Sequence, residues 1–116
     1  MERPNILYIM CDQFRFDCIA SLDNSKIKTP NLDRLVERGV SFTNAYSSCP
    51  VCVPARYTIR TGRDSASLGC YCNEAPRAPG TRTIADPESW TGPYLARTLS
   101  AAGYRTFGIG KFHTFP

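Results

Sequence analysis

The hydrophobic positions of the chain form short blocks that predict strands and helices in alternation. Residues 4–10 are a nearly continuous apolar run closed by Asp12 and Gln13, which is typical of a strand buried on both faces of a parallel sheet. Residues 40–46 alternate between polar positions and β-branched or aromatic ones, and we interpret residues 104–111 as another strand. The pattern therefore predicts three strands.

Three helices are predicted between these strands. Residues 29–40 carry apolar side chains on one face, with Thr29 as the expected cap and a proline in the first turn. Residues 54–62 and 91–103 each have a proline near the start and a glycine at the end, and Thr91 is the expected cap of the second. With the strands, this order predicts an α/β fold with a mostly parallel sheet.

Polar residues follow the first and last predicted strands. In open α/β sheets, ligands bind beyond the carboxyl ends of the strands, where Asp12 and Gln13 follow the first strand and Lys111 and His113 follow the last. Residues 63–90 are rich in turn-forming residues and lack a hydrophobic period, so they predict a long loop. We expect a binding site at this edge.

The composition is that of one modest globular domain. The chain has 116 residues, of which 42% are hydrophobic and 21% charged, with a net charge of +4. No dense Lys/Arg run argues for nucleic acid, and no apolar run approaches the ~18 residues of a membrane span. Because no secretory signal is visible, we expect a cytoplasmic protein unless a signal peptide has been removed.

The spacing of the cysteines allows several interpretations. Cys49 and Cys52 have the spacing of a redox dithiol, although a thioredoxin-like pair would follow the first core strand. Together with Cys70 and Cys72 they offer four thiolates for tetrahedral zinc, but the second pair has an unusual spacing. The pair could also be ordinary buried thiols.

The residues after Cys52 point to a fourth interpretation. The segment CVPAR (52–56), followed by Thr61 and Gly62, resembles the sulfatase motif C-x-[PS]-x-R with its trailing T-G. Three further segments resemble the other motifs of that family's N-terminal region in the same order: RPNILYIMCDQ (3–13), TPNLDRLVERGVSFTNAY (29–46) and GYRTFGIGKFH (103–113). The chain thus resembles the formylglycine-dependent sulfatases of the alkaline phosphatase-like superfamily.

The resemblance implies a fold and a domain organisation. Residues 1–116 would be the N-terminal segment of a sulfatase catalytic domain, an α/β fold with a mostly parallel sheet flanked by helices. The family's second pair of metal ligands, and a further His and Lys, come later than this chain reaches. We therefore expect an inactive fragment, whose exposed sheet edge and apolar faces favour a homo-oligomer.

The resemblance also implies a sulfuric ester hydrolase. Cys52 would be oxidised by a formylglycine-generating enzyme, and one hydroxyl of the hydrated aldehyde would attack sulfur before the other expels sulfate. Arg56, one helical turn later, would stabilise the ionised hydroxyl. Lys111 would bind a sulfate oxygen, and His113 would hydrogen-bond the nucleophile or the sulfate. If the last strand continues, both side chains project to the same side.

The metal ligands implied by the resemblance are Asp12, Gln13 and the modified Cys52. Their oxygen atoms suit Ca²⁺, with Mg²⁺ or Mn²⁺ as alternatives. An Asp-Gln pair in place of Asp-Asp is similar to choline-sulfatase-like and phosphonate monoester hydrolase-like members. This variant widens the range of substrates that the resemblance implies: a small-molecule or glycan sulfate ester is expected, and a phosphonate or phosphate ester is the alternative.

A second departure from the family pattern lies before the T-G pair. The family often has two apolar residues there, and this chain has Ile59 and Arg60. Outside the enzyme class, two alternatives stay open: a small zinc-binding module of four cysteines, and a non-catalytic assembly domain that keeps the scaffold.

Overall fold

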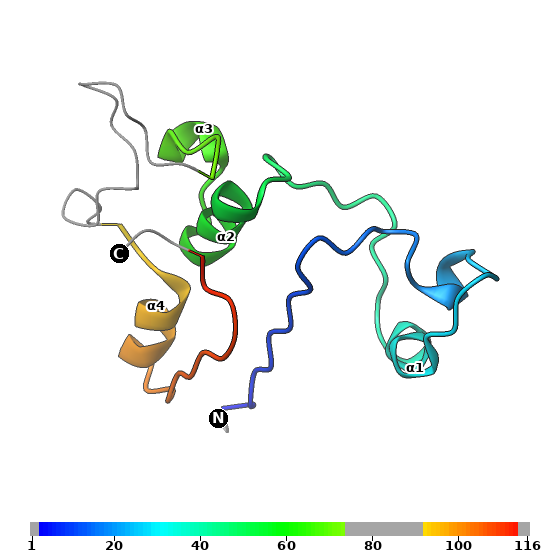
Figure 1. Ribbon diagram of the computed structural model, residues 1–116. Helices are drawn as coiled ribbons and strands as arrows, with labels where there is room; N and C mark the ends of the chain where they lie inside the picture. The colour runs from blue at the N-terminus through cyan, green and yellow to red at the C-terminus, as the bar shows by residue number, and fades with distance from the viewer. Residues whose placement is uncertain (1–2, 74–91, 114–116) are drawn as a thin grey trace. The chain divides into compact units, whose positions relative to one another are not determined.

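The computed structural model describes residues 3–73 and 92–113 and divides the chain into two units, Met1–Ala45 and Tyr46–Pro116. The first unit contains the 3-10 helix η1 (Ala20–Leu22) and helix α1 (Pro30–Arg38); the second contains α2 (Cys52–Thr61), α3 (Ser65–Leu68) and α4 (Leu95–Ala101) (Figure 1). None of the helices in these described ranges is long and apolar enough to cross a membrane.

Shared hydrogen bonds join η1 to the start of α1 in the first unit. The backbone N–H of Ala20 donates to Oγ1 of Thr29 at 2.8 Å, and that hydroxyl donates to Oδ1 of Asp33 at 2.9 Å. The backbone N–H of Ser21 donates to the same carboxylate oxygen at 3.0 Å. Thr29 does occupy the N-cap position, but its side chain makes no capping bond. Thr29, the predicted cap, therefore links η1 to α1 instead of capping the helix.

The core of the second unit is built on α2. Its buried apolar residues come from α2, from α3 and from the segment that follows: Val53, Pro54, Tyr57, Leu68 and Cys70. Ser65 is also buried, and its hydroxyl lies 3.2 Å from that of Ser48. Gly62 ends α2 with a φ of 67°, a left-handed conformation that glycine adopts without steric cost.

Each of the three predicted helices is present in the structure, but the helices begin or end at other residues than predicted. The helix predicted over 29–40 is α1, and the one predicted over 54–62 is α2, which begins two residues earlier. The helix predicted over 91–103 is α4, which begins only after Tyr94, and its predicted cap, Thr91, lies outside the described residues.

The predicted loop over residues 63–90 begins with a helix that the sequence analysis missed. The carboxylate of Asp64 accepts a hydrogen bond from the N–H of Ser67 at 2.7 Å, which is an N-cap bond that starts α3. A single helical turn is too short to show a hydrophobic period, so only the capping residue could have indicated it. Residues 74–90 of the predicted loop lie outside the described ranges.

The three predicted strands are absent from the described residues, and so is the predicted parallel sheet. The apolar side chains of these segments lie in the open: Leu7 is 84% exposed, Phe42 81% and Ile109 100%. A strand is stabilised by hydrogen bonds to a neighbouring strand, and no such pairing forms within the described part of the chain. The hydrophobic pattern is present, but the partners that would bury it are not.

We predict that Asp33 titrates at an unusually low pH. The backbone N–H of Ser21, and then the hydroxyl of Thr29, hold the pKa of Asp33 below its ordinary value of 3.8. Because the folded pKa lies below the unfolded one, this contribution to stability is complete above the unfolded value and is lost as the pH falls through the folded pKa. A carboxyl-carbon NMR titration should give a midpoint below 3.8.

The matched variant for this prediction is Asp33→Asn. Its amide oxygen keeps an acceptor but cannot titrate, so the acid-dependent part of the stability of η1 and α1 should disappear. A midpoint for Asp33 at or above 3.8 would contradict the assigned hydrogen bonds.

Candidate active site

Helix α2 begins at Cys52, and its first turn is capped from a distance. Val51 is the N-cap residue and forms no side-chain capping bond. Oδ1 of Asn73 instead accepts a hydrogen bond from the backbone N–H of Val53 at 2.9 Å. Pro54, the next residue, has no N–H to satisfy. The half-buried Cys52 therefore stands at a helix N-terminus that a residue beyond α3 completes.

Arg56 connects the helix of Cys52 to the C-terminal segment. It lies four residues after Cys52, so both side chains emerge from the same face of α2. Arg56 is 6% exposed, and its Nη1 donates to the backbone carbonyl of Lys111 at 2.7 Å. Figure 1 shows the segment after α4 returning to α2. The structure thus brings together two predicted site residues, Arg56 and Lys111. The third, Cys52, lies on the same helix as Arg56.

The backbone around Lys111 and His113 differs from the predicted strand. Gly110 has a φ of 99° and His113 a φ of 43°, both in the left-handed region. Placing the side chains of Lys111 and His113 on one side was conditional on a continued strand, and no strand is assigned to the described residues here. A left-handed histidine is uncommon and requires support from its surroundings.

Asp12 and Gln13 lie in the first unit, at a turn that follows the extended apolar segment. Gln13 has a φ of 52°, which ends the alternation of an extended chain and allows adjacent side chains to serve one site. A carboxylate and an amide oxygen are donors that suit a hard divalent cation. The described residues contain no group of three or more His, Cys, Asp or Glu that could hold a metal ion.

The described residues, which include all six cysteines, contain no group of three or more His, Cys, Asp or Glu that could hold a metal ion, and none of these cysteines forms a disulfide. This arrangement does not support the zinc-binding alternative. The thiol of Cys49 donates to the carbonyl of Tyr71 at 3.7 Å. Burial, followed by the charges of Cys72 and Cys49, raises the pKa of Cys70 above its ordinary value.

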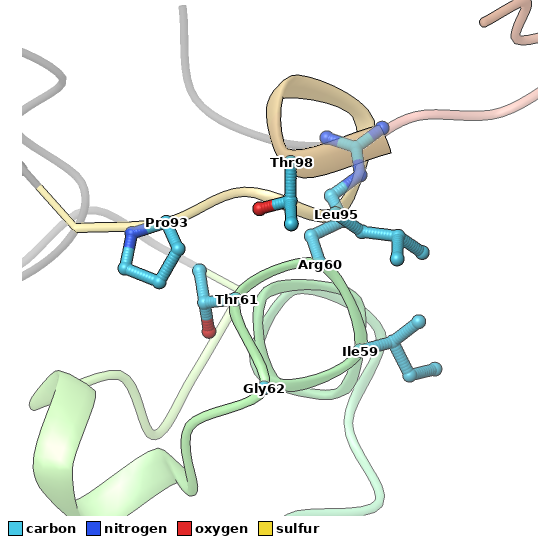
Figure 2. Close-up of a pocket in the computed structure, with 7 residues that line it drawn as sticks. All are labelled: Ile59, Arg60, Thr61, Gly62, Pro93, Leu95 and Thr98. Atoms are coloured by element: carbon cyan, nitrogen blue, oxygen red, sulfur yellow. The ribbon is translucent and has the colours of Figure 1, made fainter. Parts of the chain in front are cut away.

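A separate pocket of about 200 Å³ lies between the end of α2 and the start of α4 (Figure 2). It is lined by Ile59, Arg60, Thr61, Gly62, Pro93, Leu95 and Thr98. A helix of ten residues is about 15 Å long, so this pocket lies at the opposite end of α2 from Cys52. It is therefore distinct from the candidate active site.

Two residues that contact the segments carrying the candidate site, Asn73 and Arg60, were not predicted to do so. Asn73 lies in a segment without hydrophobic period, and nothing local in the sequence indicates that it caps a helix 20 residues earlier. Arg60 stood out only as a departure from an apolar pattern. Its guanidinium Cζ lies 5.1 Å from the centre of the Phe112 ring, a cation–π contact with the residue between Lys111 and His113.

Comparison with known proteins gives a consistent result. Residues 4–116 match the family described as Sulfatase. The chain is similar to an arylsulfatase of Clostridium perfringens, with 39% identity over 115 residues that cover 98% of this chain and 22% of that protein. Human arylsulfatase D is 36% identical over 115 residues, covering 96% and 19%. An ulvan-active sulfatase of Formosa agariphila is 34% identical over 111 residues, covering 96% and 20%.

The chain spans about a fifth of the length of these curated relatives. No solved structure matches it.

We predict that Asn73→Ala destabilises the second unit by about 1 kcal/mol, because the N–H of Val53 loses its capping acceptor. Asn73→Asp should retain the stability, since a carboxylate keeps the acceptor and is favourable at a helix N-terminus. Urea unfolding of the full-length protein measures both. Asn44→Ala, at an exposed asparagine without a side-chain hydrogen bond in the described structure, is the control. Equal losses in the Ala and Asp variants would argue against the cap.

Proposed function

Because this chain belongs to the sulfatase family, we propose that it carries the nucleophile and part of the substrate-binding set of a sulfuric ester hydrolase. Members of this family act on sulfate esters, have an alkaline phosphatase-like fold, and in general use a formylglycine residue and a metal ion. The observation that carries the proposal is the hydrogen bond from Arg56 to the carbonyl of Lys111. It joins the motif that begins at Cys52 to the motif that ends at His113.

Cys52 is the proposed site of modification. Its half-buried position at the start of α2 gives it a defined setting while leaving part of its surface accessible. A formylglycine-generating enzyme would be the partner that oxidises it. The hydrated aldehyde supplies one hydroxyl that attacks sulfur and a second that allows sulfate to be expelled. A thiol lacks the second group, so an unmodified Cys52 could not complete the cycle in this way.

Charged groups of the second unit are proposed to stabilise the transferring sulfate. Arg56 places a buried positive charge one turn from Cys52, which favours the ionised hydroxyl there. Lys111, whose backbone Arg56 holds, would direct its ammonium group to a sulfate oxygen. His113 would hydrogen-bond the nucleophile or the sulfate.

We propose that Asp12, Gln13 and the modified residue 52 contribute ligands to a divalent cation, Ca²⁺ first, with Mg²⁺ or Mn²⁺ as alternatives. The donor chemistry of Asp12 and Gln13 and the turn at Gln13 support this assignment. When bound, the cation would withdraw charge from the sulfate oxygens. A glutamine in place of a carboxylate makes the site one charge less negative.

Residues 1–116 are proposed to be the N-terminal segment of the catalytic domain. The exposed apolar segments 4–10, 40–46 and 104–111 would become strands when the partners that complete the sheet are present. The chain alone would then have an incomplete metal site and no turnover, and its exposed apolar segments would favour self-association.

A phosphonate or phosphate ester hydrolase is the second candidate within the same superfamily. The pair Asp12-Gln13 is compatible with it, because this variant is similar to both choline-sulfatase-like and phosphonate monoester hydrolase-like members. Lys111 and His113 would act on a phosphoryl group as on a sulfuryl group, since both present anionic tetrahedral oxygens.

We predict that the full-length protein hydrolyses an aryl sulfate and that Cys52→Ala lowers kcat at least about 10³-fold, because the nucleophile is lost. Mass spectrometry of the peptide carrying residue 52 should show an aldehyde in place of the thiol. Cys49→Ala, three residues earlier, is the control and should keep both the modification and the activity.

Aryl phosphonate and phosphate esters are assayed in parallel to separate the two candidate functions. Turnover of these esters without turnover of the sulfate would favour the second candidate. Full activity of Cys52→Ala on all three esters would exclude residue 52 as the nucleophile.

We predict that chelation of divalent cations abolishes turnover and that adding Ca²⁺, Mg²⁺ or Mn²⁺ restores it. Asp12→Asn should raise the cation concentration needed for half-maximal activity about ten- to a hundredfold, because a carboxylate ligand is lost. Gln13→Asp should lower that concentration by adding a negative charge. The control is Asp23→Asn, which removes an exposed carboxylate at another left-handed position. An equal effect of the Asp12 and Asp23 variants would contradict the assignment.

A further inference from the structure

One face of α2 carries three residues spaced four apart: Cys52, Arg56 and Arg60. Arg56 and Arg60 both contact the C-terminal segment, at neighbouring residues. Arg56 donates to the carbonyl of Lys111, and the guanidinium of Arg60 lies over the ring of Phe112. The helix that begins with the proposed nucleophile therefore holds this segment at two consecutive residues.

The ring of Phe112 is enclosed from a second direction by Gly108. A Cβ atom at position 108 would lie 2.6 Å from two ring carbons of Phe112, closer than such contacts occur in proteins. Phe112 is 48% exposed, so about half of the residue's surface is covered. The ring of Phe112 thus occupies the space that a side chain at position 108 would fill, and the guanidinium of Arg60 lies over it.

The side chain of Arg60 extends towards α4. It lines the pocket between α2 and α4 together with Leu95, and Figure 2 shows it leaving α2 towards α4. Its aliphatic carbons can therefore pack on apolar neighbours while the planar guanidinium faces the ring. A side chain supported in this way loses little further freedom when it makes the cation–π contact.

We propose that Arg60 is a positioning residue that acts through Phe112 on Lys111 and His113. This inference rests on the proposed function, in which the two flanking residues bind the sulfate and the nucleophile. A single hydrogen bond at Lys111 would let the segment rotate about that point, whereas a second contact one residue later fixes its direction. The left-handed backbone of His113 needs such support, because the conformation is unfavourable for a residue with a side chain.

The experiment uses the full-length protein and compares Arg60→Met with Arg60→Lys, and Phe112→Leu with Phe112→Trp. Loss of the cation or of the ring should lower kcat/KM for an aryl sulfate about three- to tenfold, the range expected for a partly exposed cation–π contact. The Lys and Trp variants keep a cation and a ring, so they should retain most of the activity. The double variant Arg60→Met with Phe112→Leu should lose no more than the larger single loss, since both remove one contact.

Arg105→Met is the matched control. Arg105 stacks on Phe107 at 5.5 Å, so the same substitution removes a similar contact on the same segment without touching Phe112. It should leave kcat/KM unchanged. Gly108→Ala is an independent variant that displaces the ring without altering Arg60, and it should reproduce the loss caused by Arg60→Met.

Hydrogen–deuterium exchange provides a readout that does not depend on activity. In Arg60→Met and Gly108→Ala, exchange of residues 108–113 should accelerate while that of α2 stays unchanged. Wild-type exchange in this segment, together with wild-type kcat/KM in both variants, would overturn the inference. A wild-type protein that hydrolyses no sulfate, phosphonate or phosphate ester would instead overturn the proposed function, and the exchange rates would still decide whether Arg60 holds the segment.

Discussion

The arrangement of the second unit depends on the hydrogen bond between Arg56 and the carbonyl of Lys111. It connects residues 55 positions apart and involves an arginine that is 6% exposed. A bond from a buried cation is stronger than one between neutral groups, and losing it would leave the buried guanidinium of Arg56 less well satisfied. The contact of Arg60 with Phe112 is possible because this bond has already brought the segment to α2.

Helix α2 can hold the C-terminal segment because both of its own ends are well defined. Gly62 stops it in a left-handed turn, and Asn73 satisfies the N–H of Val53 in its first turn. Val53 and Tyr57 face the small core, which leaves the face of Cys52 and Arg56 for contacts of another kind. The division follows from the helical period: the residues that hold the helix and those that carry the proposed chemistry alternate along it.

Residues within and next to each helix were enough to predict the helices. Contacts between residues far apart in the sequence could not be predicted from such local patterns. Proline and glycine marked α1 and α2 to within two residues, because helix ends are decided by adjacent backbone groups. The predicted strands are not confirmed in the described residues, since a strand acquires its hydrogen bonds from another segment. The motif residues Cys52, Arg56 and Lys111 were named from the resemblance, whereas the roles of Asn73 and Arg60 depend on partners far along the chain and left no pattern.

The first and the last predicted strands are each followed by a residue with a left-handed backbone. Gln13 and His113 each follow an apolar segment, and both have left-handed backbones that side chains disfavour. In a continued strand, Asp12 and Gln13 would point to opposite faces, and Lys111 and His113 to the same one. A left-handed residue removes that alternation, so such residues can be aimed by local turns rather than by a sheet. Strained backbone of this kind persists where surrounding contacts determine it, as Arg56 and Arg60 do beside His113.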